Sequence, residues 1–452
     1  MLDISIYQSK GETELFAAKT LQQLSPIRPN TETNTVTIDE ALTFQEIDGF
    51  GASFTDSSAY LIHQILEPEQ RSQLMRALFD PKDGIGLSVL RNPMGASDYA
   101  RDFYSYNDLP AGETDAELKR FSIAHDEEDI IPLLQEAVRL NPYIKLMASP
   151  WSPPGWMKTS GSMIGGELRR QYYSVYANYF VRYIKAYAAN GLPIYAVTPQ
   201  NEALYSPGHY PGMMMLPEAQ IDFINNHLKP SFIEHHIDTK ILCYDHNWDR
   251  ADYPRTVLEQ ANAAVDGVAW HWYGGKPSAQ TEIYEAFPDK EVHFTEGSGG
   301  EWIPPFEQAF SNVMRMGIEI LRNYSKSFVL WNMALDEENG PFVPGFGNST
   351  CRGIVKVDKR TKELTYTLDY YALAHFSTCI RPKAVCIASS ASHDFIRSVA
   401  FKNTDDSIAV IMFNDSDELA NIALKLQGED PISFGLESKS AISFLIKRER
   451  FF

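Results

Sequence analysis

The stretch Ile194-Tyr-Ala-Val-Thr-Pro-Gln-Asn-Glu-Ala-Leu-Tyr205 is an apolar, β-branched run that breaks at a proline and then turns polar. Gly191 and Pro193 bound it on the upstream side. This pattern is typical of a buried parallel strand whose carboxyl-terminal tip carries polar groups into a pocket. It places Asn201 and Glu202 just past the end of the strand.

A second stretch has the same form. Glu291-Val-His-Phe-Thr-Glu296 reads as a strand, and Gly297-Ser-Gly-Gly300 follows it. Hydrolysis of a glycosidic bond needs one carboxylic acid to protonate the leaving oxygen and one carboxylate to meet the sugar carbon. Two glutamates on strand tips of one barrel would satisfy this need, so Glu202 and Glu296 are candidate catalytic residues.

The segments around these strands alternate between strands and helices, which predicts parallel pairing with right-handed crossovers. Nearly every strand ends in a polar or aromatic residue suited to a pocket. This favours a closed (β/α)₈ barrel (TIM barrel) over an open doubly wound sheet, which gathers its site at one switch point. The expected strands are 45–55, 86–91, 144–149, 194–198, 240–245, 267–271, 291–296 and 327–332, and the expected helices include 127–140, 167–190, 218–227, 255–264, 306–323 and 368–380.

The two ends of the chain have a different pattern, with short alternating segments separated by Asp, Asn, Gly and Ser turns. They predict an antiparallel β-sandwich attached to the barrel and formed by both chain ends. We expect residues 1–44 to supply its N-terminal strands, 45–380 to form the catalytic barrel, and 381–452 to supply its C-terminal strands. Within the last part, strands are expected at 395–402, 408–413, 420–426 and 441–447.

Composition narrows the possible partners. The chain has 452 residues, 44% of them hydrophobic, and a formal net charge of −19 without a basic cluster, so neither nucleic acid nor an anionic membrane surface is an expected partner. The amino terminus lacks a basic start followed by an apolar run, and no apolar window is long enough for membrane insertion. These features predict a cytoplasmic protein. The cysteines show no CxxC spacing, which predicts reduced core thiols and no metal or other cofactor.

Aromatic residues crowd the expected strand tips. Sugar rings stack their apolar faces on such residues while their hydroxyls bond to polar side chains, although large aromatics are also common in protein cores. Two histidines near strand ends, His246 and His293, are interpreted as hydrogen-bonded structural residues. The aromatics are Trp151, Trp156, Tyr205, Tyr210, Trp270, Trp272, Tyr273, Trp302 and Trp331.

Seven motifs resemble glycoside hydrolase family 30, the group with acid β-glucocerebrosidase, bacterial β-glucosidases and β-1,6-glucanases, and the resemblance runs in order from about residue 46 to residue 380. The resemblance implies a (β/α)₈ barrel with a β-sandwich built from both chain ends, which agrees with the layout above. The motifs are Glu46-Ile-Asp-Gly-Phe-Gly-Ala-Ser-Phe-Thr-Asp56, Leu90-Arg-Asn-Pro-Met-Gly-Ala-Ser-Asp98, Ala148-Ser-Pro-Trp-Ser-Pro-Pro-Gly-Trp-Met-Lys-Thr159, Thr198-Pro-Gln-Asn-Glu202, His271-Trp-Tyr273, Thr295-Glu296 and Trp331-Asn-Met-Ala334.

The resemblance also implies roles for single residues. Glu202 matches the acid/base and Glu296 the nucleophile, while Asn201 matches the residue that bonds the sugar 2-hydroxyl. Arg91 matches a residue beside the nucleophile that helps to keep it ionised, since a nearby cation lowers a carboxylate pKa. Further positions match residues that grip the sugar or line the floor of the site: Asp98, Trp151, Tyr210, His271, Tyr273 and Trp331.

Two departures from the family pattern affect the expected specificity. After the position of the nucleophile, the sequence Gly297-Ser-Gly-Gly300 differs from the sequence of human lysosomal acid β-glucocerebrosidase. Ala203 stands where family members usually have proline. Because both carboxylates are kept, we expect activity by double displacement. In that mechanism Glu202 needs a raised pKa and Glu296 must stay charged.

The resemblance favours a retaining, exo-acting β-glucosidase of the glucosylceramidase type, acting on a small β-glycoside or oligosaccharide without a cofactor. An endo-β-1,6-glucanase or a β-xylosidase of the same family is the alternative. A catalytically silent carbohydrate-binding protein is a further alternative from another class, and hydrolysis of any glycoside would exclude it.

Overall fold

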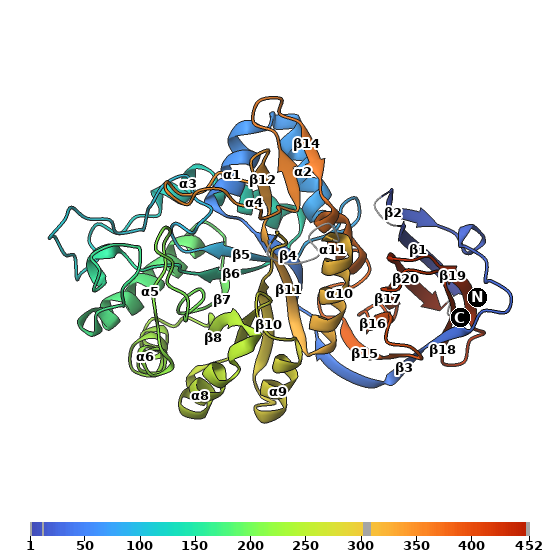
Figure 1. Cartoon of the computed structure of the whole chain (residues 1–452). Coiled ribbons are helices and arrows are strands. Elements are labelled where there is room, and N and C mark those ends of the chain that lie inside the picture. The colour runs from blue at the N-terminus through green and yellow to red at the C-terminus, as the bar shows by residue number, and fades with distance from the viewer. Residues whose placement is uncertain (1, 11–12, 302–308, 449–452) are drawn as a thin grey trace.

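Eight parallel strands close into a barrel in the computed structural model, which describes residues 2–10, 13–301 and 309–448 (Figure 1). All eight strands expected from the sequence are present, within a few residues of the expected bounds. Around the barrel the order is β10-β11-β4-β5-β6-β7-β8-β9. The strands are β4 (Gly49–Ser53), β5 (Val89–Pro93), β6 (Lys145–Ser149), β7 (Ile194–Val197), β8 (Lys240–Asn247), β9 (Gly267–His271), β10 (Glu291–Glu296) and β11 (Ser325–Asn332).

The interior of the barrel is filled by side chains. One buried layer takes a residue from each of six strands, which makes the barrel a packed core and not a pore. On β4, Gly51 lets the backbone approach β5 closely, since a Cβ there would lie 1.6 Å from the carbonyl oxygen of Val89. The layer consists of Val89, Met147, Ala196, Leu242, Ala269 and Val329.

Helices surround the barrel with their apolar faces inward. In α4 the buried residues recur at helical spacing along one face, and Thr55 caps α1 by accepting a hydrogen bond from the Ser58 amide. The helices are α1 (Asp56–Tyr60), α2 (Pro68–Phe79), α3 (Ala124–Glu128), α4 (Ile130–Leu140), α5 (Tyr173–Ala189), α6 (Pro217–Phe223), α7 (Lys229–Glu234), α8 (Asp252–Ala261), α9 (Ser278–Ala286), α10 (Ala309–Arg322) and α11 (Leu368–Ser377).

Several helix predictions need correction. The helix expected from residue 167 begins at Tyr173, because Leu168 is held in an isolated β-bridge with Lys158. The helices α2 and α9 and a small sheet of β12 (Ala334–Asp336), β13 (Val355–Val357) and β14 (Leu364–Tyr366) were not expected. Trp302 and residues 306–308 of the expected 306–323 helix lie outside the described residues.

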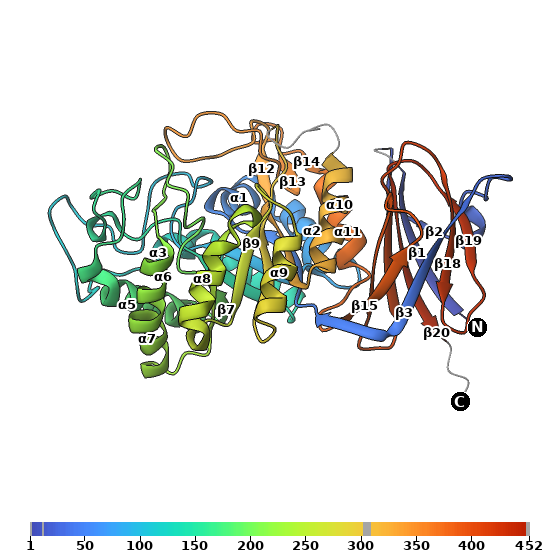
Figure 2. The same cartoon turned by 60° about the horizontal axis from the view of Figure 1, so that its bottom comes forward.

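Strands from both chain ends form one nine-stranded sheet beside the barrel, as expected (Figure 2). Its order is β19-β18-β3-β15-β16-β17-β20-β1-β2, and the antiparallel prediction fails at one pair, because β3 and β18 run parallel. The strands are β1 (Leu2–Lys10), β2 (Glu14–Lys19), β3 (Thr33–Glu46), β15 (Val385–Ala391), β16 (Ile396–Lys402), β17 (Ile408–Asn414), β18 (Ala420–Leu426), β19 (Ile432–Leu436) and β20 (Ser440–Arg448).

The long strand β3 connects the sandwich to the barrel. It passes the expected boundary between residues 44 and 45 without a break, and that boundary stays a prediction. The two parts are also joined by buried His375 of α11, whose ring nitrogens lie 2.7 Å from Ser9 Oγ and 2.8 Å from Ser443 Oγ. Arg315 of α10 pairs with Asp415 through two hydrogen bonds. Among the described residues, no helix combines the length and apolarity needed to cross a bilayer.

An ion-pair network joins strands at the amino-terminal end of the barrel. The Glu291 carboxylate lies 2.6 Å from Lys240 Nζ and 2.9 Å from Lys326 Nζ, and Lys145 pairs with Asp48 just before β4. Asp48 is buried and Glu291 is largely buried, so each carboxylate depends on its lysines to offset lost hydration. Lys326 Nζ also lies 4.0 Å from Asp48, so the network ties β6, β8, β10, β11 and the start of β4 together.

Replacement of Glu291 by Gln should lower the free energy of unfolding by about 1–3 kcal/mol, because it removes the carboxylate nearest to two partly buried lysines and leaves Lys326 only Asp48, at 4.0 Å. Asp252→Asn is the control: it breaks an exposed pair with Arg250 and should cost less than about 1 kcal/mol. Chemical denaturation followed by circular dichroism would measure both. Equal midpoints for the two variants would show that the network does not stabilise the barrel.

Candidate active site

Glu202 is held at the tip of β7 by an unusual backbone conformation. Its φ is 46°, in the left-handed region that few non-glycine residues adopt, and its amide donates to the Asp245 carbonyl at 2.8 Å. The neighbouring Asn201 amide donates to the Pro150 carbonyl at 2.9 Å. Strained backbone of this kind persists where the surrounding structure holds it, often at functional sites. Hydrogen bonds to the tips of β6 and β8 fix it here.

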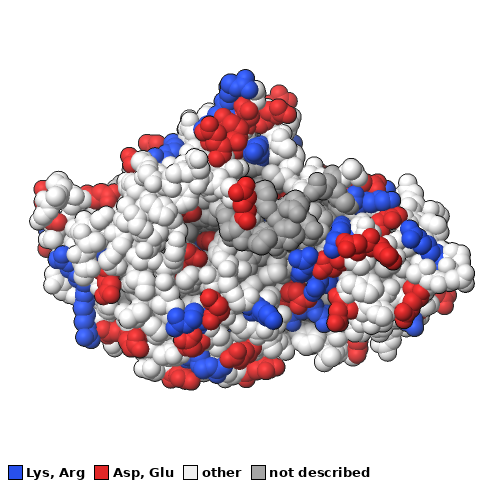
Figure 3. All heavy atoms as spheres, in the orientation of Figure 1, with Lys and Arg blue, Asp and Glu red and all other residues white. Residues whose placement is uncertain are grey.

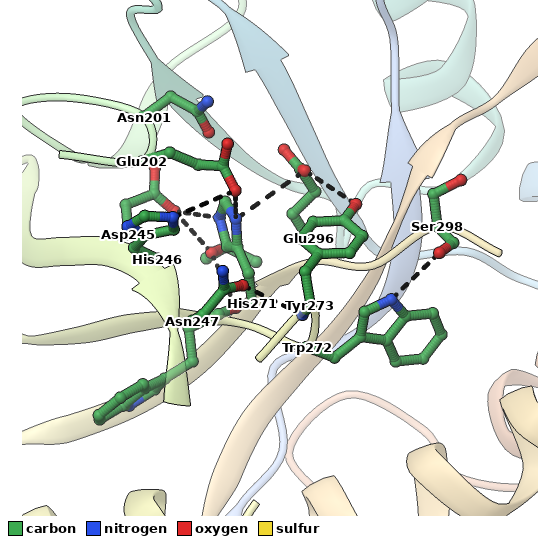
Figure 4. A network of polar contacts seen from close by, with 12 residues as sticks. Asn201, Glu202, Asp245, His246, Asn247, His271, Trp272, Tyr273, Glu296 and Ser298 are labelled. Carbon is green, nitrogen blue, oxygen red and sulfur yellow. Dashed lines mark hydrogen bonds and ion pairs between the residues drawn. The ribbon is translucent and has the colours of Figure 1, made fainter. Parts of the chain in front are cut away.

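Glu296 is the last residue of β10 and faces Glu202 across His271 (Figure 4). Its Oε2 accepts a hydrogen bond from Arg91 Nη1 at 2.7 Å, and its Oε1 accepts one from the Tyr273 hydroxyl at 3.0 Å. A carboxylate oxygen of Glu202, a ring nitrogen of His271 and a carboxylate oxygen of Glu296 all lie within 4.8 Å of one another. Carboxyl groups this close match the short separation of about 5–5.5 Å used by retaining glycosidases.

Asp245 is a buried carboxylate beneath both glutamates, and its role was not predicted from the sequence. Its two oxygens lie 2.8 Å from Arg91 Nη2 and 2.9 Å from His271 Nε2. Three hydroxyl groups also donate to it, at 2.6–2.7 Å. Its only sequence signal was its place at the end of an expected strand. The hydroxyl donors are Ser149, Thr198 and Thr295.

A bulge in β8 aims this carboxylate inward. The pairing of β8 with β9 shifts register between Tyr244 and His246, and both Tyr244 and Asp245 have positive φ, at 74° and 60°. Bulges re-aim side chains near active sites. The same bulge turns His246 toward the site, with Nε2 3.5 Å from Glu202 Oε1, so His246 lies beside a candidate catalytic residue. His293 instead bonds Glu291 and Ser327.

Burial and ion pairing shift the pKa values of the charged groups beneath the site. Burial opposes ionisation of Asp245, yet Arg91 and His271 outweigh it and hold the pKa of Asp245 well below its usual range. Burial also opposes protonation of His271, but Glu296, Asp245 and Glu202 together raise its pKa to about 9. The ring is therefore an imidazolium ion at neutral pH.

The two glutamates do not have the pKa order expected from their assigned roles. Burial raises the pKa of Glu202, but its hydrogen bond to His271 and the nearby histidines outweigh that effect, so its pKa is lowered. For Glu296 burial dominates, and the charges of His271 and Arg91 offset it only in part, so its pKa is raised. His271 Nδ1 lies between the two carboxylates, 3.4 Å from Glu202 Oε1 and 3.8 Å from Glu296 Oε1, and the expected order stays a prediction for the protein with substrate bound.

The glutamates open into a pocket of about 500 Å³. The space-filling view shows acidic atoms recessed in a hollow over the barrel (Figure 3). On one wall Trp151 and Trp331 stack with ring centroids 4.9 Å apart, and the Arg91 guanidinium lies 4.9 Å from the Trp151 ring. The predicted residues that line the pocket are Asp98, Trp151, Asn201, Glu202, Tyr210, Tyr273, Glu296 and Trp331, while Arg91 and His271 lie buried behind them.

Asp98 carries a carboxyl oxygen that is buried and has no hydrogen-bond partner among the described residues. Burial, and the negative charge of Glu296, raise its pKa well above the usual value. A buried polar atom without a partner is costly, so this oxygen is suited to a ligand hydroxyl. Of the other aromatics predicted at the strand tips, Tyr205 also lines the pocket, Trp270 and Trp272 are core residues, and Trp156 lines a separate pocket.

Within the described residues, Glu202, His271 and Glu296 are the group whose donor atoms lie close enough together to hold a metal ion. Both ring nitrogens of His271 face carboxylates that raise its pKa to about 9, so a metal ion would have to displace a stabilised ring proton. A protonated ring nitrogen has no lone pair for a metal. The protein itself supplies positive charge here, from His271 and Arg91.

Paired carboxylates, a barrel tip and a pocket with stacked aromatics define a glycoside hydrolase site. A glycosyl hydrolase family 30 TIM-barrel model matches residues 47–380, and the β-sandwich model of the same family matches residues 383–444. The chain belongs to glycoside hydrolase family 30. It is a retaining glycosidase, as the resemblance implied.

Individual relatives have different names. An endo-1,6-β-D-glucanase from Neurospora crassa is 34% identical over 385 residues, covering 82% of this chain and 79% of the relative. The lysosomal acid glucosylceramidase of Mus musculus is 32% identical over 413 residues, covering 85% of this chain and 78% of the relative. A solved endo-β1,6-glucanase structure is 31% identical with a TM-score of 0.88, covering 98% of this chain and 99% of the other.

His271 should titrate near pH 9 and not near 6.5, which selective ¹³C labelling and NMR would measure. Because this pKa is above the unfolded value of about 6.5, it contributes stability that is complete below that pH and is lost as the pH rises through 9. Asp245→Asn should lower the pKa of His271, since it removes the charge 2.9 Å from Nε2.

Asp417→Asn, a change of an exposed carboxylate in the sandwich, is the control and should leave the titration unchanged. If His271 titrated near 6.5 in the unaltered protein, its assignment as an imidazolium ion between the carboxylates would be wrong.

Proposed function

We propose that this protein is a retaining endo-β-1,6-glucanase. The observation that carries the proposal is its similarity to endo-1,6-β-glucanases, at 34% identity to a curated relative and at a TM-score of 0.88 to a solved structure. The sequence motifs favoured the exo-acting, glucosylceramidase-type activity, with this activity as the alternative. The comparisons favour the second, although the mouse glucosylceramidase is nearly as similar in sequence.

The rim of the pocket supports a sugar as the leaving group. Its exposed residues are Tyr205, His209 and Asn348, and Ser349 and Thr350 lie beside them. Hydroxyl, amide and imidazole groups can hydrogen-bond a glucosyl unit, whereas the hydrocarbon chains of a ceramide gain most from an apolar surface. The aromatic ring of Tyr205 can also stack on a sugar face.

In the proposed mechanism Glu296 attacks the anomeric carbon while Glu202 protonates the glycosidic oxygen, and the leaving chain departs with a free hydroxyl. A covalent glycosyl-enzyme on Glu296 results. Glu202, now a carboxylate, takes a proton from water, which attacks the same carbon and releases the sugar with its original β configuration. Asn201 Oδ1 accepts a hydrogen bond from Arg91 Nη2 at 2.6 Å, and Asn201 lines the same pocket as Glu296, where it would bond the 2-hydroxyl.

His271 is suited to supply the proton that Glu202 delivers. Its Nδ1 lies 3.4 Å from Glu202 Oε1, while its Nε2 is held by Asp245 at 2.9 Å. Transfer of the Nδ1 proton would make Glu202 the acid and leave a neutral ring still donating to Asp245 from Nε2. This route accounts for the low pKa of Glu202 in the protein alone.

The catalytic roles can be separated with azide. Glu202→Ala should still be glycosylated by a 2,4-dinitrophenyl β-glucoside, whose leaving group needs no proton, and azide should then release a β-glycosyl azide. Glu296→Ala should form only the α-azide, because azide takes the place of the nucleophile. Proton NMR identifies the anomer. The same anomer from both variants would contradict the assignment.

The substrate proposal predicts that soluble β-1,6-glucan is cleaved to oligosaccharides of mixed length, with the β-anomer formed first. A β-xyloside and glucosylceramide should be poor substrates, with kcat/KM lower by at least roughly tenfold, about 1.4 kcal/mol in the barrier. Chromatography of the products and early proton NMR spectra would test this. Faster hydrolysis of glucosylceramide, or release of glucose alone, would return the assignment to the exo-acting type.

The predicted cytoplasmic location remains a prediction. In that compartment short β-1,6-linked oligosaccharides would be the substrate, since a polymer does not cross a membrane intact. Short β-1,6-linked oligosaccharides therefore belong in the assay beside the polymer.

A further inference from the structure

A second pocket, of about 600 Å³, lies among the loops that follow β5 and β6. Its walls come from residues 103–114 and 155–172, and it shares no lining residue with the catalytic pocket. Because both loops leave the carboxyl-terminal ends of their strands, the second pocket opens on the same face of the barrel as Glu202 and Glu296. The mechanism above gives it no role.

An aromatic ring in this pocket is fixed in orientation. The Trp156 indole is partly exposed, and its Nε1 donates to the carbonyl oxygen and to Oδ1 of Asn107, both at 3.1 Å. Tyr172 packs edge-on against it, with ring centroids 5.0 Å apart and planes at 78°. The hydrogen bonds and the contact with Tyr172 already fix the rotamer of Trp156, so a ligand that binds to the exposed part of the ring does not have to restrict it further. It can stack on the apolar face of a sugar.

Polar groups of both signs stand beside this ring. The exposed guanidinium of Arg169 has no hydrogen-bond or ion-pair partner among the described residues, so all its donors are available. The Asp108 carboxylate accepts hydrogen bonds from the amide and hydroxyl of Ser105, which leaves acceptor capacity for a ligand. Glu113 is paired with Arg120. The opposite charges nearly cancel, which favours a neutral polyhydroxyl ligand over a phosphate or an amine.

Hydrogen bonds connect a segment that lines the second pocket to a segment that lines the catalytic pocket. Met163, which lines the second pocket, accepts a hydrogen bond from the Gly212 amide at 3.1 Å, two residues beyond Tyr210 of the catalytic pocket. Buried Lys158 donates from Nζ to the carbonyl oxygens of Met163 and Gly212, at 2.7 and 2.8 Å. The segment that contains Met163 therefore lines the second pocket, and the segment that contains Tyr210 and Gly212 lines the catalytic pocket. Buried Lys158 bonds to both segments and fixes the distance between them.

We propose that the second pocket is an accessory binding site for glucosyl units of the same β-1,6-linked chain whose cleavage occurs in the catalytic pocket. The proposal rests on the proposed function for the identity of the chain. Trp156 stacks on a sugar ring, and Arg169 and Asp108 bond its hydroxyls. A long chain that reaches both pockets is held at two points, so its apparent affinity exceeds that of a short substrate that fills only one.

The test compares a long and a short substrate. Arg169→Ala should raise KM for soluble β-1,6-glucan about tenfold while kcat is unchanged. Hydrolysis of p-nitrophenyl β-gentiobioside, which has only two glucosyl units and is expected to fill the catalytic pocket alone, should keep its KM. The neighbouring Arg170 is the matched control, since it is exposed, pairs with Asp222 and lines neither pocket. Arg170→Ala should leave both substrates unaffected.

A binding measurement tests the proposal without depending on turnover. In the Glu296→Gln background, calorimetry with β-1,6-glucan should show weaker binding after Arg169→Ala and again after Trp156→Ala, with thermal unfolding used to confirm that each variant is folded. Equal KM and equal affinity for the polymer in the Arg169→Ala and Arg170→Ala proteins would overturn the accessory site.

The two proposals fail in different ways. If the unaltered protein cleaves no β-1,6-glucan, the proposed function is wrong. The second pocket then stands as a glycan site only if binding to one of a β-1,3-, β-1,4- or β-1,6-glucan panel depends on Arg169, and it is rejected if none does.

Discussion

Asp245 is a buried charge, and the arrangement of the active site depends on pairing it. A carboxylate removed from water is tolerated only when charges and hydrogen bonds replace its hydration, and Asp245 receives five such partners. Two of them, Arg91 and His271, also contact the candidate catalytic glutamates. The positions of Arg91 and His271 are therefore fixed by Asp245 on one side and by the two glutamates on the other. The site has few alternative geometries as a result.

The backbone of the same residue supports this arrangement. The Asp245 carbonyl holds the amide of Glu202 in its left-handed conformation, while the Asp245 side chain holds His271 against the Glu202 carboxylate. A single bulge in β8 therefore positions a glutamate on a different strand through both its main chain and its side chain. In a barrel this is possible because the tips of neighbouring parallel strands lie at one edge.

Much of the fold follows from local pattern, and the site only in part. The buried strands of a parallel barrel are short apolar runs, so Ile194–Val197 and Glu291–Glu296 could be located, and the polar residues after them follow from strand direction. Asp245 could not be identified, because the bulge that turns it inward leaves no sequence signal. The pKa order of Glu202 and Glu296 depends on which carboxylate His271 approaches. The parallel pairing of β3 with β18 is set by contacts distant in sequence.

The way the sandwich is assembled has a consequence for synthesis of the chain. β1 pairs along its whole length with β20, the two joining opposite ends of the described sequence, while the barrel lies between them in sequence (Figure 2). At elongation rates of roughly 5–20 residues per second, the first strands would wait on the order of tens of seconds for their partner to emerge from the ribosome. During that time apolar Ile6, Val36 and Ile38 lack the core they finally join. The nascent amino-terminal strands therefore carry unburied apolar side chains while the barrel is synthesised, which is the condition under which chaperones bind.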